Sequence, residues 1–186
     1  MQFPEVPAGT DDLRAALGVR GTMILYVGNL EHYQGIDLLL DGFAVAAREN
    51  SEASLVIVGG AAKDVESYRV RVAALGLADR VHLVGPRPLN RLQYYLEQAD
   101  ILVSPRLRGV NTPMKVYSYL LAGKAVVATR IVSHTQVMDD AFTCLVEPTP
   151  QAMGDALAGL ARDPARRAAL GAAAATIARA RHTEPA

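Results

Sequence analysis

Cationic side chains gather in one part of this sequence that has no acidic side chain. Residues 101–138 contain five cations and neither Asp nor Glu: Arg106, Arg108, Lys115, Lys124 and Arg130. Three of these, Arg106, Arg108 and Lys115, flank the tripeptide 111–113. There, Asn111 or Thr112 suits a helix N-cap and Pro113 suits the first turn. Because helix N-termini and cations together bind phosphate, we expect a phosphate site; the alternative is an ordinary capped helix with solvated cations.

A second segment of interest is the glycine-bounded loop Gly28-Asn29-Leu-Glu-His-Tyr-Gln34-Gly35. Gly28 would let a ligand or another backbone approach closely, although the loop taken alone favours an ordinary strand-to-helix turn. Its spacing is not that of G-x-G-x-x-G, and Gly59-Gly60 rather than an acid ends the next apolar run. A dinucleotide site of the Rossmann type is therefore not predicted.

The histidines and the single cysteine give weaker signals. His32 and His134 fall in expected strand-end loops and are isolated candidates for substrate contact, whereas His82 lies within an apolar run and is expected to be structural. Cys144 lies in the apolar run 142–146, so we expect an inert thiol and no disulfide framework. The order of residues matches neither a Ser-His-Asp triad nor a metal-ligand cluster, and no metal or other cofactor is expected.

Six short apolar runs alternate with helical patterns along the chain. The runs predict strands at 22–28, 54–59, 80–85, 100–104, 125–129 and 143–146. Helices are expected at 36–47, 63–75, 90–98, 112–122, 150–161 and 164–180, with a short helix within 12–19 and a helical turn at 135–138. This alternation predicts an α/β, doubly wound, Rossmann-like domain of about six parallel strands with helices on both faces. Ligands of such folds bind at the carboxyl ends of the strands, where both segments above are expected.

Length and composition limit the possible functions. The chain has 186 residues, 51% of them hydrophobic, and 19 basic residues balance 19 acidic ones. Zero net charge argues against a protein that coats nucleic acid or an acidic membrane by bulk charge. The sequence has no membrane-span-length apolar run and no signal peptide pattern at its start, so a cytoplasmic protein is expected. We expect one domain over residues 22–186, preceded by a linker and short helix over 1–21.

Several motifs, taken in order, carry a resemblance to a known family. They are Tyr26-Val-Gly-Asn-Leu, Gln34-Gly35, Leu38-Leu-Leu, Leu55-Val-Ile-Val-Gly-Gly60, Asp79-Arg-Val-His-Leu-Val-Gly85, Ala99-Asp-Ile-Leu-Val-Ser-Pro105, Ala122-Gly-Lys-Ala-Val-Val-Ala-Thr129 and Leu145-Val-Glu-Pro148. From residue 12 to residue 181 the sequence resembles the C-terminal domain of group 1 (family 4) glycosyltransferases of GT-B fold. That resemblance implies a retaining, metal-independent enzyme whose C-terminal domain binds a nucleotide-diphosphate sugar and whose N-terminal domain carries most of the acceptor site.

The resemblance also assigns positions to the donor. It places the Gly85-Pro86-Arg87-Pro88 loop against the nucleobase, and the Gly28–Gly35 loop and the 111–115 helix start around the diphosphate. The chain departs from the family at four positions: Asn29 and Gln34 replace a common Arg and Lys, and Val110 and Ser118 replace a pair of glutamates. We therefore expect Arg106 and Lys115 to take over the lost cations as leaving-group stabilisers, with Ser118 at the ribose.

The complete donor-binding set that follows is Gly28, Asn29, Gln34, Gly35, Gly60, Pro86, Arg87, Asn111, Thr112, Pro113 and Ser118. The chain is expected to be a C-terminal half, inactive alone, whose partner is the N-terminal GT-B domain, with membrane association only through that other half. Two alternatives stay open, a non-catalytic nucleotide-binding or interaction module and a GT-B-fold nucleotide-sugar epimerase. The epimerase would need carboxylates in the cleft, which the acid-free segment does not supply.

Overall fold

The computed structural model describes residues 12–49 and 52–183 and contains one six-stranded parallel sheet. Its strands are β1 (Met23–Val27), β2 (Ser54–Val58), β3 (Val81–Gly85), β4 (Ile101–Ser104), β5 (Ala125–Thr129) and β6 (Cys144–Val146). Their order across the sheet is β3-β2-β1-β4-β5-β6, with every neighbouring pair parallel. The continuous apolar runs therefore form strands that are buried on both faces, and the predicted doubly wound α/β fold is confirmed.

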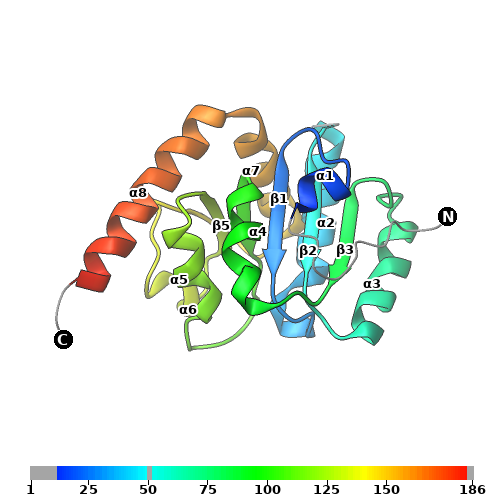
Figure 1. Ribbon diagram of the computed structural model, residues 1–186, viewed down its shortest axis with the longest axis horizontal. Coiled ribbons are helices and arrows are strands. Elements are labelled where there is room, and N and C mark those ends of the chain that lie inside the picture. The colour runs from blue at the N-terminus through cyan, green and yellow to red at the C-terminus, as the bar shows by residue number, and fades with distance from the viewer. Residues whose placement is uncertain (1–11, 50–51, 184–186) are drawn as a thin grey trace.

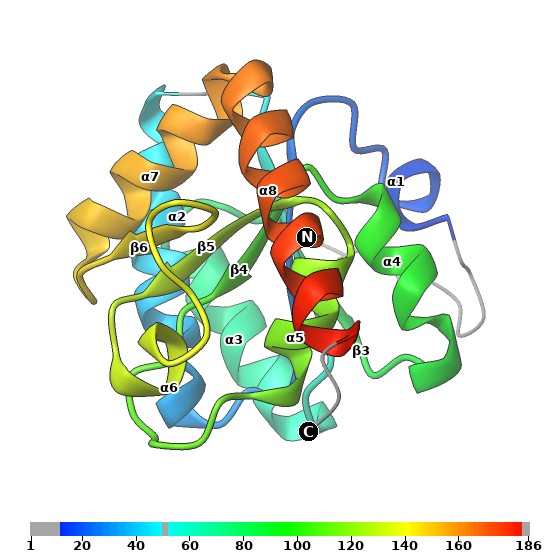
Figure 2. The same cartoon turned by 90° about the vertical axis from the view of Figure 1, so that its left-hand side faces the viewer.

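Helices cover both faces of this sheet (Figures 1 and 2). One face packs against α2 (Ile36–Glu49), α3 (Ala62–Ala74) and α7 (Pro150–Arg162). The other packs against α1 (Leu13–Ala16), α4 (Leu92–Gln98), α5 (Met114–Leu121) and α8 (Pro164–Thr183). Successive strand residues alternate between the two cores, so that Ile24 and Tyr26 of β1 face α2 whereas Met23 and Leu25 face the opposite layer.

Three short helices complete the connections: η1 (His32–Gln34), η2 (Leu89–Arg91) and α6 (Val132–Thr135). The helical turn expected at 135–138 lies three residues too late, because α6 begins at Val132. That start turns His134 into the interior, where it bonds to the end of β5. Tertiary contacts therefore decide where this turn begins.

The first described residues are packed onto the domain. Leu13 of α1 is fully buried in the core beside α4, and the Arg14 guanidinium contacts the Asp100 carboxylate at 2.8 Å. The remainder of the expected linker, residues 1–11, lies outside the described residues. Over the part of the chain that is described, no helix is long and apolar enough to cross a membrane.

The strand order places a topological switch point between β1 and β4. The chain winds toward β3 on one side of this point and toward β6 on the other. The connections that leave the carboxyl ends of β1 and β4 therefore diverge to opposite faces of the sheet, and the place between them, where ligands of such folds bind, is called the crevice below. In Figure 1 the β1 arrow points to the lower edge, where these connections lie. Both segments singled out in the sequence thus meet at one place.

Candidate functional site

Two loops form the crevice, residues 28–35 after β1 and residues 105–113 after β4. The backbone N–H of Leu107 donates to the carbonyl oxygen of Tyr33 at 2.9 Å and joins them. Gly35 has a left-handed φ of 77°, and a Cβ at this position would overlap the Pro105 carbonyl oxygen. Only glycine allows the loops to pack this closely, so the contact depends on its missing side chain.

Lys115 extends from the first turn of α5 across to the β1 loop. Its Nζ lies 4.0 Å from the centroid of the Tyr26 ring and 3.5 Å from Gln34 Oε1. A Cβ on Gly28 would lie 3.0 Å from this Nζ, so the glycine leaves room for the ammonium. Among the described residues no carboxylate pairs with Lys115; burial first, and the Arg106 charge second, lower its pKa to about 7. A desolvated ammonium without a counter-ion attracts an anion.

Arg106 supplies the second cation of the crevice and comes directly after Pro105. Its guanidinium carbon lies 5.3 Å from the centroid of the Tyr33 ring, and its Nε donates to the Arg108 carbonyl oxygen at 2.7 Å. The ring and the carbonyl fix the orientation of the planar group and leave its terminal nitrogens for a ligand. The side chain of Arg108 itself is exposed.

The start of α5 differs from the prediction. Pro113 is extended (φ −63°, ψ 134°) and occupies the N-cap position, and no side chain caps the helix. The expected cap by Asn111 or Thr112 is therefore wrong. Thr112 lies one residue too early, and its hydroxyl is 3.5 Å from Gln136 Oε1 on the segment after α6. The contrast is α7, where Thr149 caps the Ala152 N–H. The first N–H groups of α5 thus point at the crevice without a side-chain acceptor.

Tyr119 anchors α5 beside the switch point. Its hydroxyl accepts a hydrogen bond from the Val27 N–H at 2.9 Å, at the last residue of β1. The side chain is fully buried, which raises the pKa of its phenol and keeps it neutral. Tyr26 is the residue before Val27, and its hydroxyl donates to the Asn29 carbonyl oxygen in the β1 loop at 2.6 Å. Two buried tyrosines therefore hold α5 and the β1 loop in register around Lys115.

The histidine candidates take other positions than expected. His134 is fully buried and cannot touch a substrate, because its ring is enclosed between Ser104 and Thr129. Burial is the main reason why its pKa falls to about 4, which makes it neutral at physiological pH. His32 is exposed and lies 3.4 Å from the Asp37 carboxylate. Cys144 is partly buried, and burial raises the pKa of its thiol, as expected for an inert side chain.

The five cations of the acid-free segment do not form one surface. Lys124 lies before β5, at the opposite edge of the sheet, and lines a cavity there with Asp100 and Arg167. Arg130 pairs with Asp140 at 3.0 Å and with Glu147 at 3.6 Å. Acids from a later part of the chain thus neutralise it. Of the five cations, the crevice therefore receives Arg106 and Lys115, with Arg108 exposed beside them.

The remaining candidate residues lie at different places relative to Lys115. Gln34 contacts it directly, and Ser118 lies three residues later, on the same face of α5. Asn29 and Asn111 are exposed. Gly60 lies on the β1 side, where a Cβ would contact Leu30. Pro86 and Arg87 follow β3, which is separated from β1 by β2, and the Arg87 guanidinium bonds to the Pro86 carbonyl oxygen.

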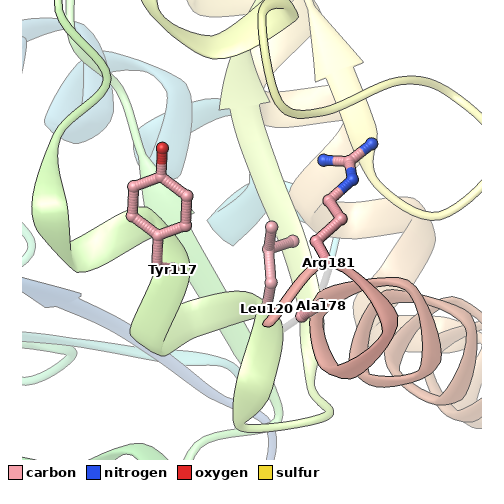
Figure 3. A pocket seen from close by; sticks show the side chains of 4 residues that line it. All are labelled: Tyr117, Leu120, Ala178 and Arg181. Atoms are coloured by element: carbon pink, nitrogen blue, oxygen red, sulfur yellow. The ribbon is translucent and has the colours of Figure 1, made fainter. Parts of the chain in front are cut away.

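A small cavity lies on the other side of α5, as Figure 3 shows. It measures about 100 Å³ and is lined by Tyr117 and Leu120 of α5 and by Ala178 and Arg181 of α8. Tyr117 is two residues from Lys115 and therefore faces away from the crevice. Within residues 12–49 and 52–183, no three His, Cys, Asp or Glu side chains are arranged to hold a metal ion.

Sequence reasoning missed the residues that position the two cations. They are Tyr26, Tyr33, Tyr119 and Thr129, to which the sequence patterns assign no functional role. Their roles come from side chains that meet across loops, for which the local pattern carries no signal. The one usable hint was that a tyrosine and a threonine each fall at the carboxyl end of a buried strand, where ligands of this fold bind.

Comparison with known proteins gives consistent matches. The family described as "Glycosyl transferases group 1" matches residues 21–163. D-inositol 3-phosphate glycosyltransferase of Corynebacterium diphtheriae is 27% identical over 180 residues, covering 92% of this chain and 42% of that protein. Mannosylfructose-phosphate synthase of Agrobacterium fabrum is 37% identical over 108 residues, covering 54% and 24%.

Solved structures match the fold. The crystal structure of Anabaena Alr3699/HepE in complex with UDP has a TM-score of 0.83 at 21% identity, covering 94% of this chain and 49% of that one. The chain thus spans about half the length, or less, of these three proteins.

Proposed function

The chain belongs to the group 1 glycosyltransferases, and we propose that it is the half of such an enzyme that binds a nucleotide-diphosphate sugar. The observation that carries the proposal is the position of Lys115 and Arg106 beside the uncapped start of α5, at the switch point between β1 and β4. Anions bind at this place in doubly wound folds. The UDP complex of the structural neighbour Alr3699/HepE supports a nucleotide as the ligand.

The proposed chemistry is electrostatic stabilisation of a leaving group. When the bond between the sugar and the diphosphate breaks, negative charge develops on the diphosphate. Arg106, Lys115 and the first N–H groups of α5 would bind this charge in a partly desolvated crevice, where hydrogen bonds are strongest. Asn29, Gln34, Asn111 and Thr112 would position the donor. The sugar would pass to an acceptor held by an N-terminal partner domain, with retention of configuration.

The other parts of the donor follow from the same placement. The Gly85–Pro88 loop, with Pro86 and Arg87, would lie against the nucleobase, and Ser118 would face the ribose. Because the protein supplies the cations for the diphosphate, we propose that no metal ion takes part. Donor affinity should then be the same in EDTA as in Mg²⁺.

Calorimetric titration of this chain with UDP, GDP, ADP and their sugar conjugates tests the proposal. We expect one nucleotide series to bind, and Lys115→Ala and Arg106→Ala each to weaken it roughly 10- to 100-fold, as expected for the loss of a charge-assisted hydrogen bond. The matched control is Lys124→Ala, which removes a cation of the same segment at the opposite edge of the sheet. Its affinity should equal that of the unaltered chain.

Three outcomes would overturn the proposal. If no nucleoside diphosphate or sugar conjugate binds at millimolar concentration, the chain is an interaction module and not a donor domain. Equal losses in Lys124→Ala and Lys115→Ala would show that general charge, and not the crevice, attracts the nucleotide. Conversion of a bound nucleotide sugar into its epimer would instead identify an epimerase.

A further inference from the structure

A chain of buried hydrogen bonds runs from α6 to the loop that carries Arg106. The His134 ring is fully buried, with Nε2 2.9 Å from Ser104 Oγ at the end of β4. Its Nδ1 lies 2.8 Å from the Thr129 carbonyl oxygen at the end of β5. Thr129 Oγ1 in turn donates to the carbonyl oxygen of Arg106. Ser104 and Thr129 are also fully buried.

The geometry fixes the place of each proton in this chain. A carbonyl oxygen only accepts, so Nδ1 carries the hydrogen that is donated to Thr129. The ring is neutral, since its pKa is lowered to about 4, and Nε2 therefore accepts from the Ser104 hydroxyl. The Thr129 hydroxyl lies 3.2 Å from Nδ1 and donates its own hydrogen to the Arg106 carbonyl oxygen. All three side chains are satisfied in one arrangement only.

Filling the space between two strands and a helix with these three polar side chains costs desolvation free energy. Apolar side chains would pack there without the desolvation penalty of three polar groups. A fully satisfied polar network instead specifies a single backbone arrangement. The backbone that it specifies here is the peptide of Arg106, whose next residue, Leu107, bonds to Tyr33 across the crevice.

We infer that His134 is a positioning residue for the leaving-group cation Arg106, and that it acts through the Thr129 hydroxyl. The inference rests on the proposed function, because Arg106 is a leaving-group cation only if a diphosphate binds in the crevice. The imidazole orients Thr129, and Thr129 holds the Arg106 carbonyl. The Tyr33 ring and the Arg108 carbonyl then orient the guanidinium. His134 itself does not touch the ligand.

Thr129→Val tests the connection, since it keeps the shape of the side chain and removes the hydroxyl. We expect it to weaken UDP binding about 3- to 10-fold, and Thr129→Ser, which keeps the hydroxyl, to restore most of the affinity. In an Arg106→Ala background, Thr129→Val should cause no further loss, because its effect passes through that guanidinium. His134→Gln should resemble Thr129→Val in both backgrounds. Equal losses with and without Arg106 would show a merely structural role and overturn the inference.

A measurement without ligand separates this inference from the proposed function. Hydrogen exchange at the Leu107 amide, which bonds to Tyr33, should be faster in Thr129→Val than in Thr129→Ser. Nitrogen chemical shifts of the His134 ring should show hydrogen on Nδ1. Unchanged exchange, or hydrogen on Nε2, overturns the positioning role whether or not UDP binds. Failure of UDP to bind the unaltered chain overturns the proposed function, and with it the leaving-group role of Arg106, but not the positioning of the Arg106 backbone that the exchange measures.

Discussion

The ammonium of Lys115 lies 4.0 Å from the centroid of the Tyr26 ring and forms no ion pair with any described carboxylate. The helix α5 brings the lysine and the strand β1 brings the ring, so the pair spans the switch point of the sheet. An aromatic face attracts a cation, but this attraction compensates for only part of the hydration free energy that the ammonium loses on burial. The charge is therefore held in a state that a bound anion would stabilise.

The first prediction concerns the pH dependence of binding. The pKa of Lys115 is about 7 in the free protein, and a bound diphosphate should raise it. Below about pH 7 the lysine is charged in both states, so the affinity for a nucleotide sugar should be constant. Above that pH, binding requires uptake of a proton, and affinity should fall about tenfold per pH unit.

Calorimetry of the nucleotide sugar from pH 6 to 9, in buffers of different ionisation enthalpy, measures this proton uptake. A nucleotide sugar is preferable to the free nucleotide because its diphosphate diester does not titrate in this range. Lys115→Arg is the control, since guanidinium stays charged and its affinity should not vary with pH. A flat profile for the unaltered chain would contradict the prediction.

The second prediction is that Lys115→Met stabilises the protein while it removes anion binding. The pKa of Lys115 is lower in the folded chain than the ordinary value of 10.5, so the unfolded state binds more protons between pH 7 and 10.5. The free energy of unfolding therefore rises with pH in that window, and the full penalty is present below pH 7. Replacing the ammonium by an apolar group should raise stability by about 1–3 kcal/mol at pH 6.5.

Urea denaturation of both proteins at pH 6.5 and pH 9.5 measures this difference. The gain in the free energy of unfolding should shrink at the higher pH, where the lysine of the unaltered chain is neutral in the folded state. A loss of stability at pH 6.5 would show that contacts of the lysine outweigh its desolvation.

The third prediction isolates the contact between the two crevice loops. Gly35 and Gly76 have similar left-handed φ values, 77° and 70°, but only Gly35 faces another backbone, the Pro105 carbonyl. Gly76→Ala should therefore cost only conformational strain, about 1 kcal/mol. Gly35→Ala should cost more, about 2–4 kcal/mol, because the loops must separate. Thermal unfolding compares the two, and equal losses would mean that the loops separate without cost.

Much of the fold could be predicted because its information is local. Val56, Val126 and Val127 lie in short uninterrupted apolar runs, which are typical of strands covered on both faces. Gly76 and Gly123 mark helix ends with their positive φ. The resemblance over most of the chain added the family, which the match over residues 21–163 confirms. The register of α6 and the cap of α5 escaped prediction, because each depends on a partner distant in the sequence.

The sequence by itself determined the order of strands and helices, the glycines at tight approaches and the supply of cations after β4. These follow from hydrophobic periodicity and from residue types, which each segment carries wherever it lies. Only the tertiary structure decided which cations share a surface. Arg130 meets acids from a later segment and Lys124 lies at the far edge of the sheet, whereas Lys115 is half-buried and packs against Tyr26. Electrostatic interaction depends on distance and burial in space, and neither is written in the spacing of charges along a chain.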